Sequence, residues 1–84
     1  YTAGRYRAVF DMMAELRPRS VLEIGCAHGL ATWLMKDFAE TVVGVDIIGS
    51  RIALGRHLFP EVELVAADFA EYLAGLGGRR FDLI

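Results

Sequence analysis

The stretch Val-Leu-Glu-Ile-Gly-Cys-Ala-His-Gly at residues 21–29 decides the fold of this chain. It opens with a short apolar run, which is typical of a strand buried in a sheet, and Gly25 ends that run. Gly25 and Gly29 bound the next turn, so the turn can be tight and a ligand can approach its backbone closely. A helical pattern follows over residues 30–39, and the sequence therefore predicts a strand, a glycine turn and a helix in succession.

The same alternation extends in both directions from this stretch. Apolar spacing predicts further helices and short apolar runs predict strands, with the helices at 5–16, 50–59 and 69–76 and the strands at 20–24, 41–45 and 62–66. Residues 81–84 read as the opening of a fourth strand. Ser50 is the expected N-cap of the helix at 50–59, and Gly77-Gly78 is the expected stop of the helix at 69–76.

Short strand–helix–strand crossovers force parallel pairing with right-handed connections. The expected fold is an α/β doubly wound parallel sheet in the order α-β-α-β-α-β-α-β. The first three strands would lie as 3-2-1, and the fourth would add on the far side of the first, which creates the switch point where such sheets bind ligands. We expect residues 1–84 to be the N-terminal half of one domain, with its C-terminal strands missing and the remainder of a longer polypeptide to follow.

Composition limits the classes of protein that fit. The chain has 84 residues, of which 55% are hydrophobic, and a mean hydropathy of +0.38, which is rich for a small soluble domain and suggests surfaces covered by more chain. The net charge is −2, and the longest basic cluster, Arg79-Arg80, is too small to indicate a nucleic-acid face. The single cysteine, Cys26, excludes an internal disulfide and a cysteine zinc cluster, and no metal site is expected.

No apolar run reaches the roughly 20 residues that a membrane helix needs, so no membrane association is expected. Arginine far outnumbers lysine, which suggests a GC-rich bacterial genome. We expect a cytoplasmic protein.

Carboxylates follow the strands at the edge where ligands bind. Asp46 ends the second strand, where a carboxylate can accept both ribose hydroxyls of a nucleoside. Asp68 follows the third strand and could accept from an adenine amino group, or it could cap the helix that starts at Phe69. Ile47 and Phe69 could hold the adenine faces. Glu23 is either a buried strand carboxylate paired with a distant arginine or a ligand-facing group, and its place beside the glycine turn favours the second.

Four segments in this order and spacing resemble class I S-adenosylmethionine-dependent methyltransferases: residues 21–29, Val-Val-Gly-Val-Asp at 42–46, Ala-Ala-Asp-Phe at 66–69 and Phe-Asp-Leu-Ile at 81–84. The resemblance implies a Rossmann-like fold, S-adenosyl-L-methionine as cofactor and methyl transfer to an acceptor of unknown class. The family's first loop usually reads Asp/Glu-x-Gly-x-Gly-x-Gly. Its middle glycine is Ala27 here, and because alanine adds only one methyl group, we expect cofactor binding to survive.

By that resemblance, each part of the cofactor has its own set of residues. The ribose would be held by Asp46, the adenine by Ile47, Asp68 and Phe69, and the methionine part by Glu23, Gly25, Ala27 and Gly29. No catalytic residue is assigned, because a general base, where the acceptor needs one, is expected after the fourth strand. His28 and Cys26 are expected to be loop residues without a catalytic role.

Two alternative functions remain. A nicotinamide dinucleotide domain shares this topology but needs G-x-G-x-x-G around a pyrophosphate, whereas this turn reads G-x-x-x-G. Glu23 would also repel a pyrophosphate, and it would favour a ligand that carries an ammonium and a sulfonium. The second alternative is a nucleoside-binding scaffold derived from a methyltransferase, which binds without turnover.

Overall fold

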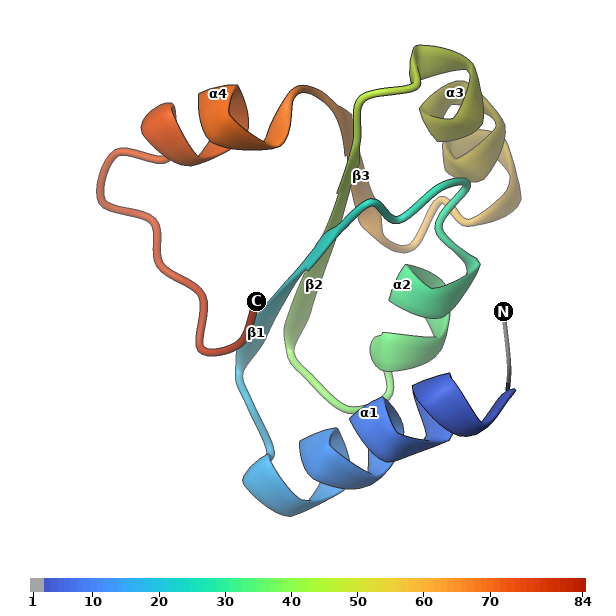
Figure 1. Cartoon of the computed structure of the whole chain (residues 1–84), viewed down its shortest axis with the longest axis vertical. Coiled ribbons are helices and arrows are strands. Elements are labelled where there is room, and N and C mark those ends of the chain that lie inside the picture. The colour runs from blue at the N-terminus through green and yellow to red at the C-terminus, as the bar shows by residue number, and fades with distance from the viewer. Residues whose placement is uncertain (1–2) are drawn as a thin grey trace.

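The computed structural model describes the backbone of residues 3–84 and the side chains of residues 7–84. Over this range, helices and strands alternate along the chain (Figure 1). The elements are α1 Ala3–Leu16, β1 Ser20–Ile24, α2 Leu30–Met35, β2 Thr41–Asp46, α3 Gly49–Leu58, β3 Glu63–Ala66 and α4 Phe69–Ala74. The expected alternation of helix and strand is confirmed, with boundaries that differ in places.

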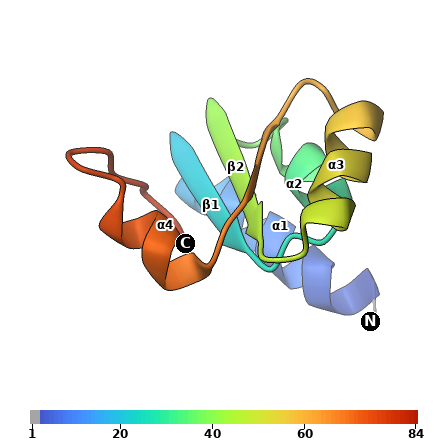
Figure 2. The same ribbon diagram turned by 90° about the horizontal axis from the view of Figure 1, so that it is seen from above.

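The three strands form one parallel sheet in the order β1-β2-β3. Leu22 of β1 lies opposite Val43 of β2, and Val45 of β2 lies opposite Val65 of β3. Helices α1, α2 and α3 lie on one face of the sheet and α4 lies on the other, as the view along the strands in Figure 2 shows. The carboxyl ends of all three strands therefore meet at one edge, and the expected Rossmann-like parallel sheet is confirmed for these strands.

Buried apolar side chains cover both faces of the sheet. β2 is buried from Val42 to Asp46, because helices lie against it on both sides. One cluster joins α1, α2 and the sheet and consists of Met13, Val21, Met35 and Val42. A second lies under α3 and consists of Cys26, Ile52 and Leu64, and a third faces α4 and consists of Leu22, Val43 and Val45. The side chain of Tyr6, expected on the buried face of the first helix, lies outside the described residues.

The fourth strand lies where the sequence predicted it but is far shorter than a strand. A single parallel bridge joins Val21 to Leu83 on the free side of β1. The Leu22 N–H donates to the Leu83 carbonyl at 2.9 Å, and the Arg19 N–H donates to the Asp82 carboxylate at 2.8 Å. The segment thus marks the switch point beside β1, although pairing is limited to this one bridge.

The helix that follows β2 begins earlier than the sequence predicted. Its N-cap is Ile48, in an extended conformation and without a side-chain cap, and Ser50 lies inside the helix. The expected cap at Ser50 is therefore wrong. The reason is that the Ile48 N–H donates to the Asp46 carboxylate at 2.8 Å, which turns the chain into the helix directly after β2.

Two other helices end earlier than expected. α2 ends at Met35 and gives way to turns over residues 36–38, so the predicted extent to residue 39 is wrong. α4 ends at Ala74, and its C-cap is Gly75 rather than Gly77-Gly78. The Gly75 N–H donates to the Glu71 carbonyl at 3.1 Å, which closes the last turn before the glycine pair is reached.

Candidate functional site

The glycine turn leaves β1 and crosses the end of β2. The N–H groups of Gly25 and Cys26 both donate to the Val45 carbonyl, at 2.7 and 3.1 Å, and these bonds fix the start of the turn. Gly25 has φ +72°, a left-handed conformation that favours glycine. Apart from Gly25 and its two neighbours in the chain, no residue has a heavy atom within 4 Å of the position that a Cβ would take there, so the turn borders open space at this point.

Asp46 connects the glycine turn to the start of α3. Its side chain is buried, with 7% of the residue exposed. One carboxylate oxygen accepts from the Ala27 N–H at 2.9 Å and the other from the Ile48 N–H at 2.8 Å. A carboxylate oxygen can accept a second hydrogen bond, so Asp46 keeps acceptor capacity for a ligand while it holds the backbone around it.

A pocket of about 230 Å³ lies at the carboxyl ends of the three strands. Of the sequence-predicted site residues, the pocket brings together Gly25, Asp46, Ile47, Asp68 and Phe69. Ile47 is 69% exposed and Phe69 is 41% exposed, so two large apolar side chains stand in solvent at the pocket. A flat apolar ligand would remove that surface from water, which is favourable in proportion to the area covered.

Asp68 both lines this pocket and caps α4. Its carboxylate accepts from the Glu71 N–H at 3.1 Å, and its backbone is extended, as an N-cap requires. The sequence left capping and ligand binding open. The capping bond is now shown, and contact with an adenine stays a prediction.

Two predicted residues shape the turn without lining the pocket. Gly29 has φ +94°, and a Cβ there would lie 2.9 Å from two methyl carbons of Leu64, so a side chain would collide with the core. Ala27 also has a left-handed backbone, with φ 54°, and its N–H is the one bound by Asp46. Gly29 and Ala27 therefore shape the site through their backbone conformations and not through side-chain contacts with a ligand.

Glu23 lines a second pocket of about 630 Å³, which lies between α1 and β1 and also includes Gly25. The remaining lining residues are Val9, Met12, Met13, Val21, Leu22, Ile24, Met35, Leu83 and Ile84. Burial raises the pKa of Glu23, and the hydrogen bond from the Thr32 hydroxyl lowers it in part. The carboxylate accepts from that hydroxyl at 2.5 Å, so its partner is a threonine and not the distant arginine that the sequence left open.

The surroundings of Cys26 and His28 do not favour a nucleophilic or acid–base role for either residue. Burial, followed by the charges of Glu23 and Asp46, raises the pKa of Cys26 to about 11, so the thiol stays protonated near neutral pH. The ring of His28 lies against Phe59 with centroids 6.2 Å apart. Neither His28 nor Cys26 lines the two pockets that meet at Gly25.

Sequence reasoning missed Thr32 and did not foresee the role of Gly55. Thr32 is fully buried in α2 and binds Glu23. Gly55 lies on α3, where a Cβ would collide with the carbonyl oxygen of His28, so the helix packs directly on the backbone of the turn. Thr32 lies three residues before the buried Met35, and this helical spacing was the available signal for its burial.

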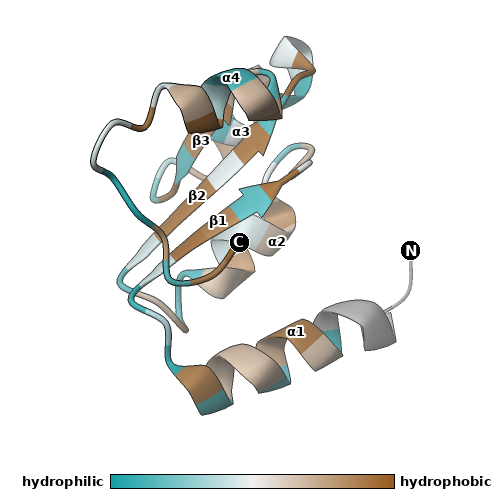
Figure 3. Ribbon diagram, turned by 60° about the vertical axis from the view of Figure 1, so that its left-hand side comes forward, coloured by the Kyte–Doolittle hydropathy of each residue, from teal (hydrophilic) through white to brown (hydrophobic). Residues whose placement is uncertain are grey.

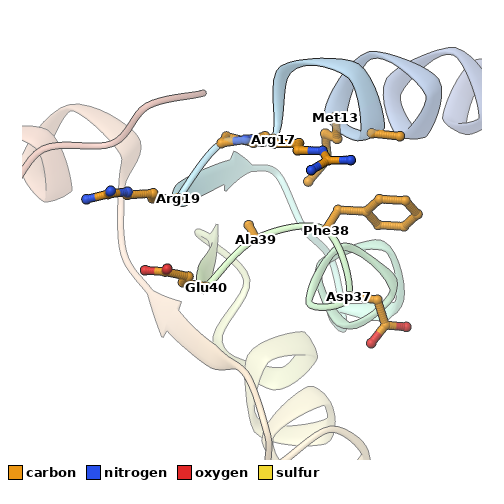
Figure 4. Close-up of a pocket in the computed structure, with 9 residues that line it drawn as sticks. Met13, Arg17, Arg19, Asp37, Phe38, Ala39 and Glu40 are labelled. Carbon is orange, nitrogen blue, oxygen red and sulfur yellow. The ribbon is translucent and has the colours of Figure 1, made fainter.

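A further pocket, of about 450 Å³, lies at the opposite ends of the strands (Figure 4). It is formed where α1 leads into β1 and where α2 leads into β2, and Figure 4 shows Arg17, Arg19, Asp37, Phe38 and Glu40 around it. It shares no residue with the pocket around Asp46. The predicted site residues therefore gather at one edge of the sheet only.

Among residues 3–84, no helix has the length and apolar character that crossing a membrane requires. Within the same range, no group of three or more His, Cys, Asp or Glu side chains is arranged to hold a metal ion.

Comparison with known proteins places the chain. No family model matches the sequence. Two curated proteins of Mycobacterium tuberculosis, each named a probable S-adenosylmethionine-dependent methyltransferase, are 33% identical to this chain over 72 residues. The match covers 84% of this chain and 26% of each relative, so the chain spans about a quarter of their length.

Solved structures agree with the sequence relatives. The amino pentose methyltransferase CalS10 of Micromonospora echinaspora, which is involved in calicheamicin biosynthesis and was solved with S-adenosylmethionine bound, superposes with a TM-score of 0.66 at 27% identity, over 77% of this chain and 28% of that chain. Over the matched segment, the chain is similar in both sequence and fold to class I S-adenosylmethionine-dependent methyltransferases. Another methyltransferase, the 23S rRNA enzyme ErmE, superposes with a TM-score of 0.66 at 32% identity, over 82% of this chain and 30% of that chain.

Proposed function

We propose that this chain binds S-adenosyl-L-methionine across the two pockets that meet at Gly25, and that the protein transfers the methyl group to an acceptor. The observation that supports this most directly is the pocket at the strand ends. It joins a buried carboxylate, a glycine with open space beside it and two exposed apolar side chains, contributed by three different strand–helix junctions. Its neighbour adds the Glu23 carboxylate.

The residues present fit the parts of this cofactor. Asp46 keeps free acceptor capacity for ribose hydroxyls, although both of its oxygens already hold backbone N–H groups. Ile47 and Phe69 offer exposed apolar surface for the adenine faces. Glu23 is negative when ionised and would attract the positive ammonium and sulfonium of the methionine part, whereas it would repel the pyrophosphate of a dinucleotide.

The cofactor supplies a methyl group that its sulfonium already activates. The chain's contribution is then to hold the reacting centre in place and to keep water out, and positioning of this kind can supply about 7–11 kcal/mol of a reaction barrier. The similar structures include an amino pentose methyltransferase and a 23S rRNA methyltransferase, whose acceptors belong to different chemical classes. Both of these enzymes contain a segment similar to this chain, so we place acceptor recognition, and any general base, elsewhere in the protein. A cytoplasmic location remains part of the proposal.

Replacement of Asp46 tests the proposal in the natural full-length polypeptide. Asp46→Ala leaves polar partners unpaired, and we expect it to weaken S-adenosylmethionine binding by about 1–3 kcal/mol in calorimetry. Asp37→Ala is the matched control, because it removes an exposed carboxylate that belongs to the pocket at the other end of the strands. Unchanged affinity in Asp46→Ala would remove this residue from the site.

A second variant separates binding from support of the turn, since Asp46 also holds backbone groups. Ile47 is mostly exposed, so Ile47→Ala should leave the melting temperature unchanged and still weaken cofactor binding. Methyl transfer from labelled cofactor to a panel of acceptors then distinguishes the alternatives. Binding without turnover on every acceptor would favour a scaffold, and preferential binding of NAD would favour a dinucleotide domain.

A further inference from the structure

The contact between Thr32 and Glu23 joins α2 to β1 inside the molecule. Thr32 has no exposed surface, so water cannot replace its hydroxyl group. The Thr32 Oγ1 donates to Glu23 Oε1 at 2.5 Å. An ionised carboxylate only accepts hydrogen bonds, which fixes the direction of this bond and leaves the second carboxylate oxygen for another donor.

The surrounding backbone leaves just enough room for this hydroxyl. A Cβ at Gly44 of β2 would lie 2.6 Å from Thr32 Oγ1 and 2.9 Å from Cys26 Sγ, both closer than such contacts allow. A threonine within a helix can instead bond to the carbonyl four residues earlier, which here belongs to His28. The structure directs the hydroxyl to Glu23, and the bare backbone of Gly44 makes the space for it.

Glu23 needs such a partner because its surroundings disfavour a charge. The other residues that line its pocket, from α1, β1, α2 and the last residues of the chain, carry no titratable side chain. Beyond the pocket, the Cys26 thiol interacts electrostatically with both Glu23 and Asp46. Desolvation raises the pKa of Glu23, and the Thr32 hydroxyl is the contact that opposes this rise. A hydrogen bond to the ionised form favours that form.

We infer that Thr32 is a positioning residue for cofactor binding: its hydroxyl orients the Glu23 carboxylate and keeps it negatively charged, so that the free oxygen faces a cationic ligand group in the pocket beside Gly25. The inference rests on the proposed function, because the cationic group it assigns is the ammonium or sulfonium of S-adenosylmethionine. Thr32 itself touches no ligand in this scheme.

The test compares Thr32→Val with Thr32→Ser in the natural full-length polypeptide. Valine keeps the branched shape and removes the hydroxyl, whereas serine restores the hydroxyl. S-adenosylmethionine affinity is measured by calorimetry between about pH 5.5 and pH 8. A hydrogen bond to a charged group is worth about one pKa unit or more, so we expect Thr32→Val to move the midpoint of the affinity profile up by about one pH unit.

The expected loss follows from the sign of this shift. Binding of a cation requires ionised Glu23, so affinity falls as the pH falls through the pKa of Glu23, and a higher pKa moves that loss to higher pH. Thr32→Val should therefore bind up to about tenfold more weakly at pH values below the pKa of Glu23 and lose less at pH values above it. Thr32→Ser should return the profile toward that of the wild type. An unchanged profile in Thr32→Val would overturn the inference.

A ligand-free measurement separates this inference from the proposed function. Carbon NMR follows the titration of the Glu23 carboxyl, assigned with Glu23→Gln, in the wild type and in Thr32→Val. An upward shift in Thr32→Val supports the role of Thr32 even if the wild type fails to bind S-adenosylmethionine, an outcome that would overturn the proposed function alone. Identical titrations in the two proteins would overturn the positioning role alone.

Discussion

The backbone of Ala27 adopts a left-handed conformation, which is energetically unfavourable for a residue that has a side chain. Its φ is 54°, in the left-handed region, and its N–H is held there by Asp46. Non-glycine residues pay roughly 1–2 kcal/mol in this region, which glycine avoids. The resemblance to methyltransferases places a glycine at this position, so this chain carries an alanine where glycine would avoid that cost.

Ala27→Gly should therefore stabilise the protein. We expect a gain of about 0.5–1 kcal/mol, since the relief of strain exceeds the added entropy of the unfolded glycine. The measurement is the midpoint of urea unfolding. Ala31→Gly is the matched control, because Ala31 lies in α2, where glycine costs roughly 0.5–1 kcal/mol. A loss of stability in both variants would show that the turn tolerates Ala27 without strain.

At the scale of single residues, the sequence predicted which positions gather but not how they are held. Gly25, Asp46 and Phe69 follow strands, and parallel strands place such residues at one edge whatever their side chains do. The two backbone N–H groups bound by Asp46 depend on the path of the turn, which no local pattern encodes. Thr32 was missed because the helical spacing that suggests its burial gives no indication of the partner of its hydroxyl group.

The contact between α3 and the glycine turn is made by bare backbone. Gly55 faces the His28 carbonyl, and a Cβ on Gly55 would collide with that oxygen. Backbone atoms cannot move aside as a side chain can, so a methyl group here must push the helix away from the turn. The position of α3 against the turn thus depends on Gly55 having no side chain.

Gly55→Ala is expected to lower the free energy of unfolding by about 1–3 kcal/mol or more, the usual cost of overpacking. Gly49→Ala on the same helix is the control, since nothing lies within 4 Å of a Cβ there. That variant should be neutral or slightly stabilising. Thermal unfolding monitored by circular dichroism compares the two, and equal melting temperatures would contradict the close packing described at Gly55.

The sequence predicts which helices and strands exist, but it does not predict where each of them ends. The short segments at 20–24 and 41–46 are rich in apolar residues and predict strands, and the sheet buries Val21 and Leu22 of the first and Val42 to Asp46 of the second. The start of α3 depends on the hydrogen bond between Asp46 and Ile48, which outweighs the capping preference of Ser50. The extent of pairing by residues 81–84 depends on contacts with β1 that residue patterns do not contain.

The described part of the chain exposes much apolar surface for its size. Figure 3 shows apolar residues on α1 and on the segment that ends the chain, in addition to those of the sheet. Leu16 is 62% exposed and Ile84 is 67% exposed. Small domains bury a modest fraction of their surface, so the margin between folded and unfolded states is narrow.

A polypeptide limited to these 84 residues should accordingly be poorly stable. We expect a broad thermal transition of low midpoint in calorimetry, because β1 has only the single bridge of Leu83 on its free side. The natural full-length polypeptide is the comparison, and we expect it to unfold in a sharper transition. A sharp two-state melt of the 84 residues alone would contradict this view.

Every residue that lines the pocket around Asp46 comes from one continuous stretch, from Ile24 to Phe69. Recombination that exchanges sequence outside this stretch therefore leaves each wall of that pocket in its original gene segment. The arrangement keeps the walls of this pocket, though not those of the pocket beside Glu23, within one gene segment.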